Sequence, residues 1–181
     1  MNESKKAKAL EDELIKKTAE QHNISFESCQ AIHMKFKAQS NNREYISLEK
    51  FNSFFSFTLE LPMTNLQRYL KIGSNGVNFS TFVFLFLAVE NVYNNSHFLK
   101  LFYNLFLTEN GFNYMIFISE LRANMLLRSK SDENDIISFF ESKIANPNGY
   151  LTAEQFQYIV SPSSDILEKA KLLIFGSYIF T

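Results

Sequence analysis

The sequence predicts an all-α protein built from pairs of helices. Gly and Pro are few, at 5 and 3 of 181 residues, and most long stretches repeat apolar residues with the 3.6-residue period of a helix. A third observation is a recurrence, in which a polar loop carries one apolar residue just before a predicted helix and a second apolar residue follows five positions later. The loop residues are Ile46, Val77, Ile116 and Leu151, and their followers are Phe51, Phe82, Leu121 and Phe156. A fourfold recurrence predicts a repeated helix–loop–helix unit.

The first two predicted helices lie before residue 40. One covers residues 4–20, and one of its faces carries Leu10, Leu14, Ile15 and Thr18. Ser25 is the expected N-cap of the second helix, which ends near Ala38. A serine hydroxyl can accept a hydrogen bond from an amide that the first helical turn leaves without a partner.

Three further helices are predicted before residue 94. Ser47 is the expected N-cap of a helix over 48–60, and Thr64 with Gln67 forms the pattern of a capping box at the start of the next one. The stretch 79–93 is apolar nearly all round, which predicts a buried or covered helix.

The second half of the chain continues the helical pattern. Helices are expected over 98–106, 117–127, 132–144 and 152–160, and a short last helix follows a turn at 161–165. Thr152 and Gln155 predict another capping box. The chain then ends in an apolar tail at 171–181.

These elements divide the chain into four parts. We expect an N-terminal helix at 1–21, an N-lobe of two helix pairs at 22–94, a C-lobe of two more at 95–160, and a C-terminal helix with the apolar tail at 161–181.

The recurring loop resembles the loop of an EF-hand, in which an apolar residue at position 8 lets two loops pair. Calcium needs oxygen ligands at positions 1, 3, 5, 7 and 9 and a bidentate Glu at position 12. Three of the four loops place Lys50, Thr81 and Gln155 at position 12. The third loop, aligned on Ile116, has Glu109 at position 1 and Glu120 at position 12, so these two are the only metal candidates. We therefore expect four degenerate EF-hands and no bound calcium, since affinity follows the charge of the ligands.

Composition excludes several classes of partner. The net charge is −1 with Lys and acidic residues interleaved, so no basic stripe exists to follow nucleic acid. One cysteine, Cys29, excludes an internal disulfide.

Targeting and membrane signals are also not expected. The N-terminus lacks the apolar core of a signal peptide, Asn2 stands where myristoylation needs Gly, and the apolar run 79–89 is too short to span a membrane. A cytoplasmic or cytoskeletal protein is expected.

The sequence predicts no enzymatic activity, no catalytic residues and no cofactor. Cys29 and His33 lie one helical turn apart, but no third ligand or orienting acid stands near them, so ordinary packing is expected. Glu120 and Glu141 have nothing that places them in one cleft as an acid–base pair.

Aromatic residues are unusually abundant, with 20 Phe and 8 Tyr but no Trp. The apolar side chains that exceed the needs of a small core lie mostly on the helix at 79–92 and in the tail at 172–181. The expected partner-binding groove consists of Phe82, Phe84, Phe86, Leu87, Leu173, Phe175, Tyr178 and Phe180. Two alternatives stay open, since the tail can fill the groove of its own chain or leave it for a partner helix. The lysine-rich first helix is a solvated face or a contact for an acidic surface such as that of tubulin.

Several segments resemble the calcineurin-B and neuronal-calcium-sensor branch of EF-hand proteins. They are more similar to the calaxin family, EF-hand proteins associated with the outer dynein arm docking complex of cilia. The resemblance is carried by "KKAKALEDELIKK" (5–17), "FESCQAIHMKF" (26–36), "FTLELPMTNLQRYL" (57–70) and "KLLIFGSYIFT" (171–181). It implies a docking or scaffold role in the ciliary axoneme, with helical or coiled-coil docking-complex subunits, dynein or tubulin as partners. The calcium ligands depart from the family, so calcium regulation is not carried over. The alternative is a calcium-responsive regulatory subunit or light chain of the calcineurin-B type.

Overall fold

The computed structural model describes residues 3–55, 60–90 and 95–176. These ranges contain ten helices and three short strands. The helices are α1 (Glu3–His22), α2 (Phe26–Ser40), α3 (Leu48–Asn52), α4 (Glu60–Tyr69), α5 (Phe79–Glu90), α6 (Ser96–Leu105), α7 (Tyr114–Ala123), α8 (Lys130–Glu141), α9 (Ala153–Val160) and α10 (Ser164–Phe175), and the strands are β1 (Leu107–Thr108), β2 (Gly111–Asn113) and β3 (Tyr150–Leu151). The expectation of a mainly helical protein is confirmed, with a small sheet added to it.

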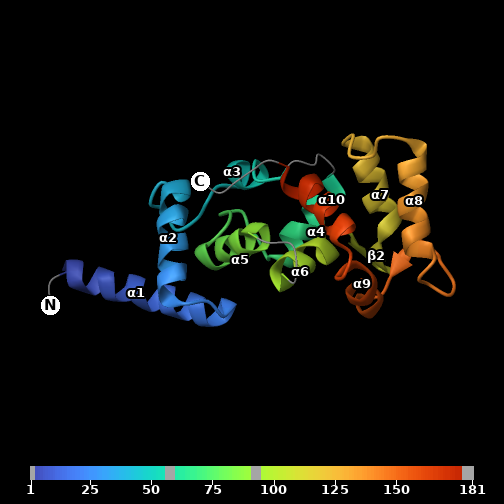
Figure 1. The fold of residues 1–181 in the computed structure, drawn as a ribbon. Helices are drawn as coiled ribbons and strands as arrows, with labels where there is room; N and C mark the ends of the chain where they lie inside the picture. Colours follow the sequence, from blue (N-terminus) through green and yellow to red (C-terminus); the bar gives the residue numbers. More distant parts are fainter. Residues whose placement is uncertain (1–2, 56–59, 91–94, 177–181) are drawn as a thin grey trace.

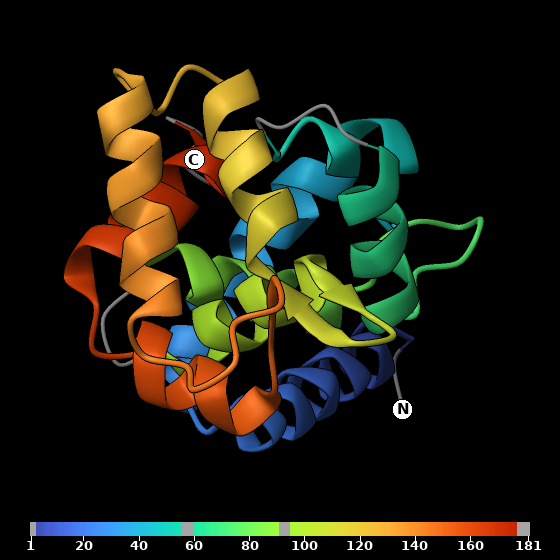
Figure 2. The same cartoon turned by 90° about the vertical axis from the view of Figure 1, so that its right-hand side faces the viewer.

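The helices form an elongated body with α1 and α2 at one end and α7 and α8 at the other (Figure 1). In both views α7 and α8 lie side by side, and they pack against each other (Figure 2). Helix α6 occupies the middle, where it packs against α4, α5 and α9. Helix α10 lies between the two ends and contacts α7.

A single hydrophobic cluster runs through both halves of the molecule. In the second half it centres on Phe102, whose ring lies 5.2 Å from Phe112, 4.8 Å from Phe117 and 5.4 Å from Phe156. Edge-to-face contacts at these distances stabilise aromatic cores beyond the burial of area alone. The abundance of Phe is therefore largely a property of the core.

Helix length and polarity bear on membrane insertion. The longest helix, α1, has 20 residues and is strongly charged, whereas the most apolar one, α5, has only 12. No helix in the described ranges is both long and apolar enough to cross a bilayer.

Several predicted helix starts are confirmed by their hydrogen bonds. The Ser25 and Ser47 side chains accept from the amides of Ser28 and Lys50. Both halves of the capping box formed by Thr152 and Gln155 are present at α9.

The capping box predicted at Thr64 is wrong, because Thr64 lies inside α4. That helix begins at Glu60 and has Pro62 in its first turn. Proline suits this position, since its fixed φ is helical and its missing N–H would have no partner there. The proline therefore marks the start of α4 better than the threonine does.

Four predicted boundaries also differ from the structure. Helix α3 ends at Asn52, well before residue 60. Helix α7 covers Tyr114–Ala123 instead of 117–127, because the Asn113 side chain accepts from the amide of Ile116 and caps the helix earlier. Helix α8 starts at Lys130, behind the N-cap Ser129. The last helix, α10, is 12 residues long and not short.

Candidate functional site

The first and second loops are joined by their backbones at Ile46 and Val77. Each residue donates its N–H to the carbonyl oxygen of the other, at 2.8 and 2.9 Å, and both side chains are buried. Gly76, with φ +99°, lies so close to this pair that a Cβ atom would clash with the Ile46 carbonyl oxygen. The close approach of the two loops therefore requires glycine here.

The third and fourth loops repeat this arrangement through β2 and β3. Phe112 pairs with Leu151 in antiparallel register, and β1 adds a third strand on the other side of β2. Gly111 precedes Phe112 as Gly76 precedes Val77, and its φ is +113°. A Cβ atom on Gly111 would clash with the carbonyl oxygen of Leu151.

The residues after each paired position also recur. The next residue caps a helix: the side chains of Ser47, Asn78, Asn113 and Thr152 accept from the amide three residues further on. Five residues after the paired position stands a buried Phe in every unit, namely Phe51, Phe82, Phe117 and Phe156. We call the paired residues Ile46, Val77, Phe112 and Leu151 the loop anchors.

The third anchor predicted from the sequence is wrong. Ile116 lies in the first turn of α7, and Phe112 takes the place expected for it. Likewise Phe117, and not Leu121, is the equivalent of the other three phenylalanines. The stretch from Phe112 to Phe117 offers several apolar residues, and only the pairing with Leu151 identifies which of them is the anchor.

The corrected alignment separates the two metal candidates. With Phe112 at position 8 of an EF-hand loop, position 12 is Ile116. Glu109 is exposed in the turn between β1 and β2, whereas Glu120 is buried within α7, where burial raises its pKa. Within the described ranges, no group of three or more His, Cys, Asp or Glu side chains could hold a metal ion.

The eight residues predicted to form a partner-binding groove lie in three different settings. Phe82, Leu173 and Phe175 are buried, and Phe84, Phe86 and Leu87 on α5 are half-buried. Tyr178 and Phe180 lie outside the described residues. The Phe175 ring stacks on Phe55 at 5.8 Å, so the end of α10 packs against the segment that follows α3.

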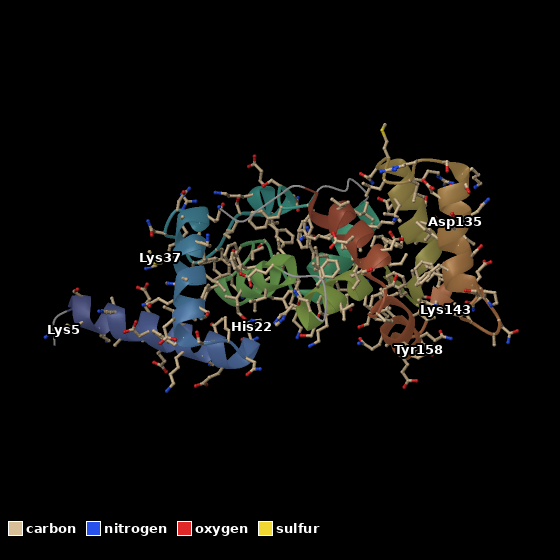
Figure 3. The ribbon with its side chains drawn as sticks, in the orientation of Figure 1. Lys5, His22, Lys37, Asp135, Lys143 and Tyr158 are labelled. Atoms are coloured by element: carbon tan, nitrogen blue, oxygen red, sulfur yellow. The ribbon has the colours of Figure 1, made fainter. Side chains whose placement is uncertain are left out.

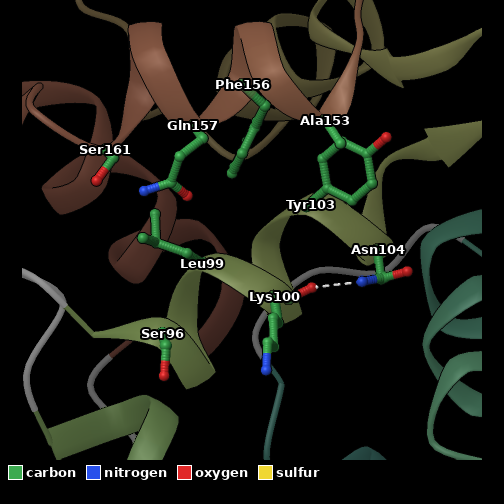
Figure 4. Close-up of a pocket in the computed structure, with 9 residues that line it drawn as sticks. All are labelled: Ser96, Leu99, Lys100, Tyr103, Asn104, Ala153, Phe156, Gln157 and Ser161. Atoms are coloured by element: carbon green, nitrogen blue, oxygen red, sulfur yellow. Dashed lines mark hydrogen bonds between the residues drawn. The ribbon is translucent and has the colours of Figure 1, made fainter.

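A pocket of about 380 Å³ lies between α6 and α9 (Figure 4). Leu99 and Tyr103 from α6 and Phe156 from α9 give it apolar surface, and Ser96, Gln157 and Ser161 supply polar groups. Lys100 is the one formally charged residue among those lining it. Burial raises the pKa of Tyr103, so its phenol stays a hydrogen-bond donor. A pocket with this lining suits an apolar side chain that has an acidic group beside it.

Cys29 and His33 both lie buried on α2. Cys29 is a free, buried thiol whose pKa is raised by burial, which disfavours the reactive thiolate. His33 Nδ1 lies 3.3 Å from Glu11 Oε1 on α1, and its ring meets Phe79 edge-on at 4.7 Å. Together with Lys37, which donates to the same Glu11 oxygen at 2.6 Å, His33 joins α2 to α1.

A histidine contact that the sequence does not reveal joins α1, α5 and α6. His22 Nδ1 lies 3.3 Å from His97 Nε2, and His22 Nε2 lies 3.3 Å from Ser80 Oγ. Figure 3 labels His22 at the end of α1. The two histidines are 75 positions apart, so only the packing of α1 against α5, and of α5 against α6, brings them together.

No family model, no curated protein and no solved structure matches this chain. The loop anchors and the α6–α9 pocket are therefore the features of the described residues that bear on function.

Proposed function

We propose that this chain is a non-catalytic adaptor built from four degenerate EF-hands in two paired lobes. The observation that carries the proposal is the pairing of Ile46 with Val77 and of Phe112 with Leu151, each within a repeated unit of anchor, cap and Phe. In an EF-hand, loop pairing, helix caps and buried aromatic residues of this kind determine the fold. The part that binds the ion is replaced: position 12 holds Lys50, Thr81, Ile116 and Gln155.

Calcium independence follows from the charge of these loops. A calcium ion is bound through several oxygens and a bidentate carboxylate, and the affinity depends on the number of charged ligands. Since no unit has a carboxylate at position 12, the adaptor is proposed to keep one conformation whatever the calcium concentration.

The proposed binding surface extends over α6, beside the pocket that α6 forms with α9. An amphipathic partner helix would place one apolar side chain against Leu99, Tyr103 and Phe156. An acidic residue next to that side chain would face Lys100. On the α5 side, the half-buried Phe84 lies 5.3 Å from the His97 ring of α6 and lies beside this surface.

The cellular setting of this proposal rests on the resemblance of the flanking segments to the calaxin family. We place the adaptor in a ciliary axonemal assembly like the outer dynein arm docking complex. Its partners would be helical or coiled-coil docking-complex subunits, dynein or tubulin.

The test compares two variants on α9. Gln157→Trp places a large ring at the mouth of the pocket, whereas Tyr158→Ser changes the neighbouring residue, which is exposed and points away from α9 (Figure 3). Tagged wild-type protein is expected to retain coiled-coil docking subunits from native cells, with cross-links to α6 or α9. Gln157→Trp should reduce their recovery at least tenfold, and Tyr158→Ser should leave it unchanged.

Two results would overturn the proposal. One is equal recovery of the partner by both variants, or cross-links that avoid α6 and α9. The other is calorimetry that shows micromolar calcium binding abolished by Glu109→Gln. That result would favour the calcium-responsive, calcineurin-B-type alternative.

A further inference from the structure

The contact of His22 with His97 belongs to a chain of hydrogen bonds whose direction the neighbours determine. Ser80 Oγ donates its proton to Gln21 Oε1 at 3.0 Å, so toward His22 it acts as an acceptor. His22 must then carry its proton on Nε2, which donates to Ser80. This leaves the lone pair of His22 Nδ1 to accept from the Nε2–H of His97.

The chain is satisfied while both rings are neutral, and a first proton on His97 Nδ1 leaves it intact, because His97 Nε2–H still donates to His22 Nδ1. A second proton, on His22 Nδ1, would bring an N–H toward the N–H of His97, and two donors facing each other at 3.3 Å repel. Two positive charges would then also lie side by side in a half-buried site. Protonation of both rings therefore forces them to separate.

The surroundings of the pair also oppose a positive charge. Burial is the largest cause that lowers the pKa of each histidine, and the Lys100 ammonium lowers both further. An interaction with the Ser80 backbone offsets part of this for His22. The neighbours on α1 and α5 are the neutral Gln21, Ser80 and Phe84. Among the described groups that act on the two rings, none is a carboxylate.

We propose that the His22–His97 contact is a pH-sensitive latch, which holds the end of α1 against α6 at neutral pH and opens on mild acidification. Glu11 with Lys37, and the buried Ile15, Thr18 and Ala19, still hold the middle of α1 when the latch is open. The opening is therefore confined to the last turn of α1 and the segment after it. This inference does not depend on the proposed adaptor function.

The sign of the pH dependence follows from the direction of the pKa shifts. Both histidines titrate below 6.5 in the folded chain and near 6.5 in the unfolded chain. The unfolded state then binds more protons at mildly acidic pH, so stability is complete above pH 6.5 and decreases as the pH falls through the folded values.

Nitrogen-15 NMR of the histidine rings in the full chain tests the latch directly. At pH 7.5 the expected result is His22 protonated on Nε2 only, with both rings titrating as a coupled pair below pH 6.5. Hydrogen-exchange protection of the amides from Gln21 to Asn23, corrected for the intrinsic pH dependence, should fall at least tenfold between pH 7 and pH 5.5.

Two variants separate the latch from general acid destabilisation. In His97→Gln the side-chain amide can donate to neutral His22 or accept from protonated His22, so protection of Gln21–Asn23 should persist at pH 5.5. His33→Gln removes the third histidine, which contacts Glu11 instead, and should leave the loss of protection unchanged. Independent titration of His22 and His97 in the wild type would overturn the proposal even if a variant failed to fold. So would loss of protection in acid by folded His97→Gln.

Discussion

At the scale of single residues, Gly76 is the position where the first loop pair tolerates no side chain. Its φ is +99°, and a Cβ atom would clash with the carbonyl oxygen that joins Ile46 to Val77. Gly76→Ala is expected to lower the free energy of unfolding by on the order of 2–4 kcal/mol, because strain and the broken loop pair add up. Urea denaturation followed by circular dichroism measures this loss.

Gly73 is the matched control for this substitution. It lies in the same loop, but its φ is not positive and nothing lies within 4 Å of an added Cβ. Gly73→Ala should therefore change stability by at most about 1 kcal/mol, in the stabilising direction. Equal losses of unfolding free energy in Gly73→Ala and Gly76→Ala would show that the effect of Gly76→Ala does not come from the loop pairing.

The two glutamates predicted as metal candidates are expected to differ in their effect on stability. Burial raises the pKa of Glu120 above its ordinary 4.5, so ionisation costs more in the folded state than in the unfolded state. The destabilisation is absent well below pH 4.5 and grows as the pH rises through the folded pKa. Glu120→Gln should therefore raise the urea midpoint at pH 7, and this gain should shrink at pH 4.

Glu109→Gln is the control, because Glu109 is exposed in the β1–β2 turn. Its free energy of unfolding should stay within about 0.5 kcal/mol of the wild type at both pH values. A Glu120→Gln variant that is less stable than the wild type at pH 7 would contradict the argument from burial.

At the scale of elements, the identity of the third anchor can be tested by truncation. Phe112 is fully buried between β1 and β3 and meets Phe102, Phe117 and Phe156. Phe112→Ala should cost about 3–5 kcal/mol, whereas Ile116→Ala, at a half-buried site, should cost less than about 2 kcal/mol. Chemical denaturation of both variants decides between the two alignments, and a larger loss at Ile116 would restore the one predicted from the sequence.

The elements also show which parts of the structure a sequence can predict. N-caps such as Ser25, Ser47 and Thr152 were predictable from the sequence, because the hydroxyl and the amide that donates to it are only three residues apart. The third anchor was not, since Phe112 is identified only by its partner Leu151, 39 positions away in the printed sequence. The histidine contact was invisible for the same reason, as it depends on how α1, α5 and α6 pack. Local sequence patterns thus predicted the helices, whereas the paired loops and the histidine contact depend on tertiary packing.

At the scale of the whole molecule, one hydrophobic cluster joins the two proposed lobes. Helix α6, just after residue 94, packs against α4 and α5 as well as α9. Helix α10 buries its apolar face, and its Phe175 stacks on Phe55 in the other half. Because these contacts belong to one hydrophobic cluster, unfolding either half would expose apolar surface of the other.

We therefore expect one cooperative unfolding transition. The chain has no Trp, so Tyr69→Trp on α4 and Tyr150→Trp on β3 each provide a single fluorescent probe, one in each half. In each variant, the fluorescence change in urea should coincide with the loss of helical circular dichroism, as two-state unfolding requires. Fragments 22–94 and 95–160, expressed separately, should lack a cooperative transition because each exposes the surface that α6 or α10 covers. If the fluorescence and dichroism midpoints separate in either variant, the two halves unfold independently and α6 is only a contact between lobes.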